Sequence, residues 1–261
     1  MYRALYLVIM VKKKQKRCEI IVTRELYLLD SYQAKCEAGI LSIDEDKIIL
    51  DQTVFYPTGG GQEHDTGWLQ QGDVTVEVHK VKKEQGEIVH YIKTPGKLSV
   101  GPVRAEINWE RRHGLMRHHS MLHVLGSVFY KHYGSLCTGN QIYEDRARID
   151  LTGITELGDD ELMKMIHEAN VEIFHNHPIT TRIVPREEAE AISGSIKTVV
   201  NLIPESVREI RLVKIGDIDE QACGGTHVKE TQEIGKIVLE KTKNKGKGVT
   251  RLELHAESKA T

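Results

Sequence analysis

Two histidines four residues apart, His119 and His123, are the first residues whose spacing suggests chemistry. They lie in residues 111–126, a stretch without proline in which apolar residues recur at helical spacing. On a helix, side chains four residues apart project from the same face. Since an unpaired buried polar group costs about 1–3 kcal/mol, two imidazoles on an apolar face need partners. A metal ion is one such partner, and an ordinary histidine pair in the core or on the surface is the alternative.

A thiol and an imidazole follow about a hundred residues later, in the segment Cys223-Gly224-Gly225-Thr226-His227. Its two glycines favour a tight turn over a helix. Two histidines from a helix and a Cys and a His from a turn form a four-ligand nitrogen and sulfur set, the kind that zinc takes. A buried apolar cysteine is the alternative for Cys223 alone. Taken together, the four residues favour a metal site with the ligands His119, His123, Cys223 and His227.

A glycine-rich segment lies upstream, Phe55-Tyr56-Pro57-Thr58-Gly59-Gly60-Gly61-Gln62. Three consecutive glycines lose much conformational entropy on folding, which indicates that the chain needs a positive φ or a close backbone approach there. A nucleotide-binding P-loop would continue with Gly-Lys-Ser/Thr, and Gln62 excludes it. From these residues alone, a plain hairpin turn is the alternative.

The two histidine motifs resemble the paired metal motifs of the alanyl-tRNA synthetase editing domain. The glycine-rich segment resembles that of the medium-sized AlaX proteins, which are free-standing relatives of this domain that act in trans. The resemblance covers about residues 23–257 and includes three motifs in the expected order. It implies a zinc-dependent hydrolase that deacylates mischarged tRNA(Ala), chiefly Ser-tRNA(Ala), with Gly-tRNA(Ala) as an open alternative.

In such an enzyme zinc would lower the pKa of a bound water, polarise the ester carbonyl or hold the amino group of the amino acid. We therefore expect a zinc-bound water to act, and no side chain is assigned as a base. Four protein ligands are typical of structural zinc, whereas catalytic zinc usually keeps an open position. Either the ion becomes five-coordinate, or one ligand leaves in the working state, and Cys223 on its turn is the first candidate to leave.

Polar residues near these motifs are candidates for substrate contacts. By the resemblance, the glycine-rich loop acts as a lid from one domain onto the active site. A pocket that hydrogen-bonds the seryl hydroxyl rejects alanine, because alanine leaves a buried polar group unpaired. The candidates are Thr58, Gly59, Gly60, Gly61 and Gln62 on the loop, and Asn140 and Gln141 on a predicted polar turn. The alternative for each is an ordinary turn residue.

The most basic segment, residues 236–251, is the first candidate for tRNA binding. Lysines and glycines alternate in it, which predicts a flexible loop that contacts phosphates. The candidate residues are Lys241, Lys243, Lys245, Lys247 and Arg251. A solvated hairpin is the alternative, in which case Arg111, Arg112 and Arg117 become the candidates.

The apolar patterns predict an α+β protein. Residues 19–102 alternate as short strands, which predicts a small N-terminal antiparallel β-barrel, since closure removes exposed edges. Residues 103–261 predict the zinc-binding editing domain, an antiparallel sheet with helices on one face. We expect it to contain the metal helix, a helix from Asp159, a short helix after Pro185 and strands at 147–150, 209–215, 236–240 and 250–255. Its other histidines, His167, His175 and His177, lack a matching ligand set and are expected on the surface.

Composition limits the remaining possibilities. The net charge of −2 over 261 residues argues against a surface that binds polyanions throughout. Four dispersed cysteines and no secretory signal indicate a cytoplasmic protein. The apolar run within residues 1–18 is too short to span a membrane, and we expect these residues to be a dispensable tail with Met10 as a plausible start.

Two other classes of protein compete with the hydrolase. A non-catalytic, zinc-stabilised RNA-binding module would explain the closed ligand set and the basic segment. A zinc peptidase would need Glu after the first histidine, where Ser120 stands. No obligate protein partner is evident from the sequence.

Overall fold

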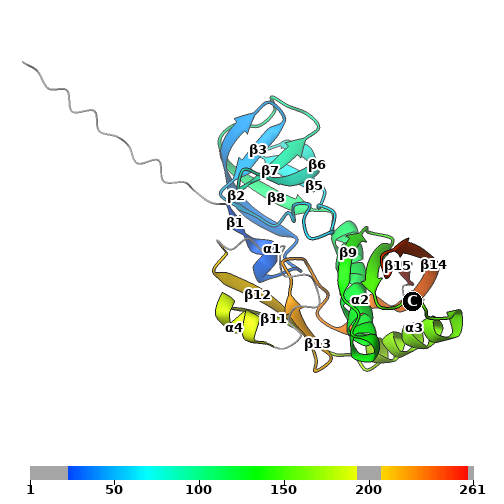
Figure 1. Cartoon of the computed structure of the whole chain (residues 1–261). Coiled ribbons are helices and arrows are strands. Elements are labelled where there is room, and N and C mark those ends of the chain that lie inside the picture. The colour runs from blue at the N-terminus through cyan, green and yellow to red at the C-terminus, as the bar shows by residue number, and fades with distance from the viewer. Residues whose placement is uncertain (1–22, 193–206, 258–261) are drawn as a thin grey trace, which may run out of the picture.

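Two large hydrophobic cores and a third, small cluster organise the computed structural model, which describes residues 23–192 and 207–257. One large core fills a barrel, and the other surrounds a long central helix. Figure 1 shows the barrel and this helix in different parts of the molecule. The expected tail, residues 1–18, lies outside the described residues. Within those residues, no helix is long and apolar enough to cross a membrane.

The predicted barrel is confirmed as a closed, antiparallel, six-stranded barrel in the order β2-β3-β7-β6-β5-β8. Its strands are β2 (Lys35–Asp44), β3 (Lys47–Leu50), β5 (Gly67–Gln71), β6 (Val74–Glu84), β7 (Glu87–Ile92) and β8 (Gly101–Ile107). A two-stranded parallel pair, β1 (Arg24–Glu25) with β4 (Gln52–Thr53), and a short helix, α1 (Leu26–Leu29), lie beside it. Strand β8 pairs with β2 and β5 to close the barrel, so the barrel continues past residue 102, its expected end.

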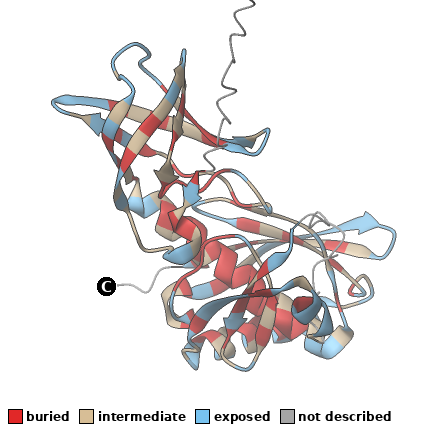
Figure 2. Cartoon of the chain, turned by 90° about the vertical axis from the view of Figure 1, so that its left-hand side faces the viewer, coloured by how far each residue is buried: buried red, intermediate tan, exposed pale blue. Residues whose placement is uncertain are grey.

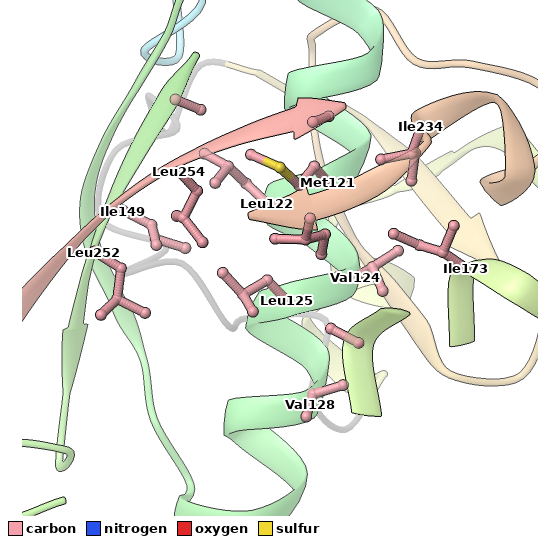
Figure 3. Packing of buried hydrophobic residues seen from close by; sticks show 14 of the residues in the cluster. Met121, Leu122, Val124, Leu125, Val128, Ile149, Ile173, Ile234, Leu252 and Leu254 are labelled. Atoms are coloured by element: carbon pink, nitrogen blue, oxygen red, sulfur yellow. The ribbon is translucent and has the colours of Figure 1, made fainter. Parts of the chain in front are cut away.

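The predicted metal helix is the central element of the second core. It is α2 (Trp109–Tyr133), which begins because the Asn108 side chain accepts a hydrogen bond from the Arg111 amide and ends at Gly134 in the left-handed conformation. Most of its middle turns are buried (Figure 2). Its apolar side chains, including Leu122 and Leu125, pack against Ile149, Leu252 and Leu254 of the neighbouring sheet (Figure 3).

That sheet is antiparallel, in the order β14-β15-β10-β9, and both α2 and α3 (Asp159–Phe174) pack on it. Its strands are β9 (Cys137–Ile142), β10 (Ala147–Thr152), β14 (Lys236–Gly246) and β15 (Val249–Glu257). Residues 138–141, which we predicted as a polar turn, belong to β9. Their main chain pairs with β10, and Ile142 also exchanges hydrogen bonds with the glycine-rich loop. This pairing overrides the weak strand propensity of Gly139 and Asn140.

A second, three-stranded antiparallel sheet leads to the cysteine turn. Its order is β11-β12-β13, with β11 (Ile179–Pro185), β12 (Glu209–Ile215) and β13 (Asp219–Ala222). The predicted short helix α4 (Arg186–Ala191) packs beside β11 and β12, and a 3₁₀ turn, η2 (Thr231–Ile234), precedes β14. Because β13 ends one residue before Cys223, this sheet determines where the turn meets α2.

Candidate metal centre and its pocket

The structure brings the four predicted ligands together. His119 and His123 lie one turn apart on α2, and Cys223 and His227 lie on the turn that follows β13. One ligand atom from each residue lies within 4.8 Å of the other three. The Cys223 Sγ atom lies 3.4 Å from His119 Nε2 and 3.4 Å from His227 Nε2.

These distances fit a metal ion in a tetrahedral site. Zinc bonds to sulfur at about 2.3 Å and to nitrogen at about 2.0–2.1 Å, which separates the two ligand atoms by roughly 3.5 Å. The three histidines and Cys223 offer nitrogen and sulfur ligands, which suit zinc, whereas magnesium and calcium prefer oxygen ligands. The cluster is therefore a group that could hold a metal ion.

Each histidine has a second residue at its other ring nitrogen. His119 Nδ1 donates to Gln62 Oε1 at 2.8 Å, His227 Nδ1 lies 3.0 Å from Ser120 Oγ, and His123 Nδ1 lies 3.3 Å from Asp219 Oδ2. Such partners hold a metal-binding imidazole in one orientation and keep its Nε2 free for the ion.

The pKa values reflect this close packing. Burial raises the pKa of the Cys223 thiol, but His119 and His227 outweigh burial and hold this pKa well below its usual range. Burial lowers the pKa of His227 well below its ordinary value. A thiolate and a neutral imidazole are the forms that bind metals. Burial also lowers the pKa of His123, but Asp219 and Cys223 together raise it to about 9.

The two glycines of the cysteine turn have different surroundings. A Cβ atom on Gly225 would lie 2.1 Å from His119 Cε1, so only glycine lets the turn approach the helix this closely. A Cβ atom on Gly224 would meet nothing within 4 Å. The sequence indicated a tight turn, and the structure adds that one of its glycines is in direct contact with a ligand.

The glycine-rich loop is a tight turn from the barrel to this centre. Gly59 and Gln62 exchange main-chain hydrogen bonds, and Gly60 and Gly61 have positive φ values of 57° and 85°. Gln62 is fully buried. Its Oε1 accepts hydrogen bonds from His119 Nδ1 and the Thr226 amide, and its Nε2 donates to Thr226 Oγ1 at 2.9 Å. Since both ends of the amide are engaged, Gln62 supports the metal ligands and is not available for the substrate contact that we predicted.

A pocket of about 450 Å³ opens above the ligands, between the barrel and β12–β13. Its lining residues include Tyr56, Thr58, Gly59, Gly60, His119, His123, Asn140, Arg211, Gln221 and Cys223. Thr58, a predicted substrate contact, is exposed at this pocket, and its hydroxyl lies 3.1 Å from His64 Nδ1. The glycine-rich loop thus forms part of the wall beside the ligands.

Of the two other predicted substrate contacts, Asn140 lines the pocket and Gln141 does not. Asn140 lines the pocket together with His119 and His123, and among the described residues its buried Oδ1 has no hydrogen-bond partner. It also lines a smaller adjoining cavity of about 40 Å³, where the buried Ser135 Oγ is likewise unpaired within the described chain. Gln141 lines neither space, because neighbouring residues of a strand point to opposite faces.

The basic segment forms a β-hairpin, which was the alternative to the predicted flexible loop. Strands β14 and β15 pair along their length and turn at Lys247 and Gly248, both with positive φ. The four predicted lysines, Lys241, Lys243, Lys245 and Lys247, are all exposed. Arg251 instead binds Asp150 through two hydrogen bonds of 2.7 and 2.8 Å.

The alternative candidates for tRNA binding, three arginines of α2, make ion pairs and hydrogen bonds within the protein. Arg112 is fully buried in an ion pair with Asp65 that joins α2 to the barrel. Arg111 bonds to Glu63 and Glu144, and Arg117 donates to three backbone carbonyls, those of residues 233, 234 and 256. These arginines are therefore engaged within the protein, and their role as alternative tRNA contacts stays a prediction.

Some residues of the centre were missed in the sequence analysis. Asp219, Gln221 and Cys223 alternate along β13 and the turn, which places them on one face. The Gln221 Nε2 atom donates to Asp219 Oδ2 at 2.7 Å, so the two side chains form one buried group behind His123. The alternation of polar residues leading up to a ligand was the signal that could have identified them.

Comparison with known proteins agrees with this arrangement. Residues 12–111 match the family "tRNA synthetases class II (A)", and residues 210–253 match "Threonyl and Alanyl tRNA synthetase second additional domain". The chain is 40% identical over 235 residues to the alanyl-tRNA editing protein AlaX-M of Saccharolobus solfataricus, an alignment that covers 88% of this chain and 98% of the relative. The chain belongs to the AlaX-M family.

Other relatives show the same relationship. The AlaX-M protein of Methanosarcina acetivorans is 39% identical over 241 residues, with 88% of this chain and 98% of the relative covered. The alanine–tRNA ligase of Pyrococcus abyssi is 39% identical over 233 residues, which cover 88% of this chain but only 25% of the ligase. A chain of the AlaX-M family thus corresponds to one quarter of the longer ligase.

Proposed function

We propose that this protein hydrolyses the ester bond of tRNA(Ala) mischarged with an amino acid, chiefly serine, at a zinc centre formed by His119, His123, Cys223 and His227. One observation carries the proposal: in a chain of the AlaX-M family, three of the four nitrogen and sulfur ligands, His119, His123 and Cys223, line a pocket large enough for an aminoacyl group and part of a nucleotide. A zinc ion bound there would supply a Lewis acid next to the ester carbonyl.

The protein's own residues position the reacting groups. Gln62, Ser120 and Asp219 orient the three histidines, and the Gln62 contact makes the barrel part of the same site. We propose that the two parts of the chain, a barrel with its glycine-rich loop and an editing domain, act as one unit at this junction. Arg211 helps to hold the cysteine turn, because its Nη1 donates to the backbone carbonyls of Cys223 and Gly225.

Selection of serine over alanine is assigned to Asn140 and the small cavity behind it. The cavity of about 40 Å³ has room for a hydroxymethyl group, and two buried oxygens, Asn140 Oδ1 and Ser135 Oγ, lack partners among the described residues. Serine would supply a hydrogen bond there and alanine would not. A buried polar group left unpaired costs about 1–3 kcal/mol, which corresponds to a rate preference of roughly 5- to 150-fold.

Steady-state deacylation of Ser-tRNA(Ala) and Ala-tRNA(Ala) tests this selectivity. We expect the protein to hydrolyse the seryl ester faster and Asn140→Ala to lose most of the preference. Gln141→Ala is the matched control, since this neighbour lies on the opposite face of β9, and it should keep the preference. Equal rates on the two esters by the unmodified protein would contradict the assignment.

The closed set of four ligands favours a second candidate function, a zinc-stabilised module that binds tRNA without hydrolysis. It predicts tRNA binding and bound zinc but no release of amino acid. Release of serine at a rate above spontaneous hydrolysis excludes this candidate.

We further propose that the exposed lysines of the β14–β15 hairpin contact tRNA phosphates, since they are unburied and two of them, Lys241 and Lys243, lie on the same side of their strand. The protein is proposed to act in the cytoplasm, where charged tRNA is present.

A further inference from the structure

A second group of metal-ligating side chains lies at the carboxyl end of α3, outside the centre described above. It consists of Glu172, His175 and His177, whose ligand atoms all lie within 4.8 Å of one another. Glu172 Oε2 lies 2.8 Å from His177 Nε2 and 3.6 Å from His175 Nδ1. From the sequence we expected these histidines on the surface without a ligand set. His175 does lie on the surface, but the carboxylate of Glu172 completes a three-ligand set that the sequence did not indicate.

The backbone brings these side chains together. Glu172 lies in the last turn of α3, and His175 caps the helix in a right-handed conformation. Asn176 then has a φ of 57°, which reverses the chain so that His177 returns toward Glu172. The side chain of Asn176 stabilises this reversal by donating to Glu230 Oε2 at 2.8 Å and accepting from the Gln232 amide at 3.1 Å.

Neighbouring residues fix the main chain of His177 and pack against one side of its ring. Its amide donates to Thr231 Oγ1 at 2.9 Å, and its carbonyl accepts from the Thr231 amide at 3.0 Å. A Cβ atom on Gly216 would lie 2.7 Å from His177 Nδ1, so glycine makes room for the ring there. With this side of the ring packed, Nε2 faces Glu172.

Charge and donor type favour a transition-metal cation at this position. The carboxyl end of a helix carries partial negative charge through the helix dipole, and Glu172 adds a carboxylate. Two imidazoles and one carboxylate suit zinc, copper or nickel, and three protein ligands leave room for water on the ion. The His175 side chain is 55% exposed, which gives an ion access from solvent.

We propose that Glu172, His175 and His177 form a second binding site for a divalent transition-metal ion such as zinc. The site links the end of α3 to the segment that enters β11. Among the described residues, other histidines pair with a single glutamate, and the two shortest such pairs are His132 with Glu168 and His255 with Glu240, both at 2.7 Å. Neither of these pairs belongs to a three-ligand group among the described residues, so they serve as controls.

Titration of the full-length, metal-free chain with cobalt(II) and zinc(II) tests the proposal. We expect two equivalents of metal per chain. The equivalent at the cysteine-containing centre should show sulfur-to-cobalt charge-transfer absorption, whereas the second should not, because its ligands are nitrogen and oxygen. His175→Ala combined with His177→Ala should bind one equivalent with the charge-transfer band intact, and Glu172→Gln should weaken the second equivalent at least about tenfold. His255→Ala should still bind two.

Two results would overturn the proposal: a single equivalent bound by the unmodified chain, or two equivalents retained by the double histidine variant. The substituted residues are partly exposed, and a melting curve of each variant verifies that it is folded. The proposal is independent of the deacylase function, because deacylation of Ser-tRNA(Ala) reports only on the first centre and should be the same in the double variant.

Discussion

Replacing Gly225 with alanine should remove the metal while leaving the protein folded. The added Cβ atom would lie 2.1 Å from His119 Cε1, 2.4 Å from His119 Nδ1 and 2.9 Å from Gln62 Oε1. An ordinary carbon–carbon contact is about 3.5–4.0 Å, so the turn and the His119 ring must separate by roughly 1.4 Å. Metal–ligand distances tolerate changes of only about 0.2 Å. The shift is therefore several times larger than the centre can absorb.

The expected result is a loss of metal affinity of more than about 100-fold, because the change displaces a ligand and not only the hydrogen-bonding partner of one. The strain on the fold should be smaller, about 1–3 kcal/mol, since overpacking costs that much when the neighbours can shift. Gly224→Ala is the matched control, because its added Cβ atom meets nothing within 4 Å and its φ lies outside the left-handed region.

Zinc content by elemental analysis and competition with a chelator measure the two affinities, and a thermal melt shows whether each variant is folded. The Gly224 variant should bind zinc like the unmodified protein. If the Gly225 variant does so as well, the cysteine turn does not contact His119 as described, and the geometry of the centre is refuted.

Three further predictions follow from the same structure. Gln62→Leu removes the hydrogen bond to His119 and should lower zinc affinity about 10- to 100-fold in the same competition assay. An unchanged affinity would show that the glycine-rich loop of the barrel does not contribute to metal binding. Burial lowers the pKa of His90 to about 4. As pH falls from about 6.5 toward 4, His90 therefore binds a proton in the unfolded chain but not in the folded chain. This residue should lower the free energy of unfolding by up to roughly 1.4 kcal/mol per pH unit. Urea denaturation between pH 7 and 5 should show a shallower fall for His90→Gln, and equal slopes would contradict the prediction. Lys243→Ala with Lys245→Ala should flatten the log–log salt dependence of tRNA binding by roughly one to two units and raise KM while sparing kcat; an unchanged slope would mean that tRNA binds elsewhere.

Residue type and spacing predicted the four residues that come together as a group able to hold a metal ion, because such a centre needs particular donor atoms. His119 and His123 could be placed on one face of a helix, since helical periodicity is a local property. Their distance from Cys223 could not be predicted, because it depends on how β13 and α2 pack. The barrel was predictable for a related reason. Alternating hydrophobicity indicates strands with one buried face, and closing the sheet into a barrel leaves no exposed strand edge.

The errors concern residues whose environment depends on tertiary contacts. Asn140 has turn-like neighbours in sequence, but the hydrogen bonds of β10 draw it into a strand. Arg112 appeared to be a free cation, and its burial against Asp65 depends on the junction between α2 and the barrel. The grouping of Glu172 with His177 requires the left-handed turn at Asn176, which no composition or periodicity indicated.

The most direct test of the central claim is single-turnover deacylation of Ser-tRNA(Ala) by the metal-free protein, before and after addition of one equivalent of zinc. If the centre of His119, His123, Cys223 and His227 is the active site, hydrolysis is lost with the metal and returns with zinc. Full hydrolysis by the metal-free protein, or none after zinc is bound, would contradict this account.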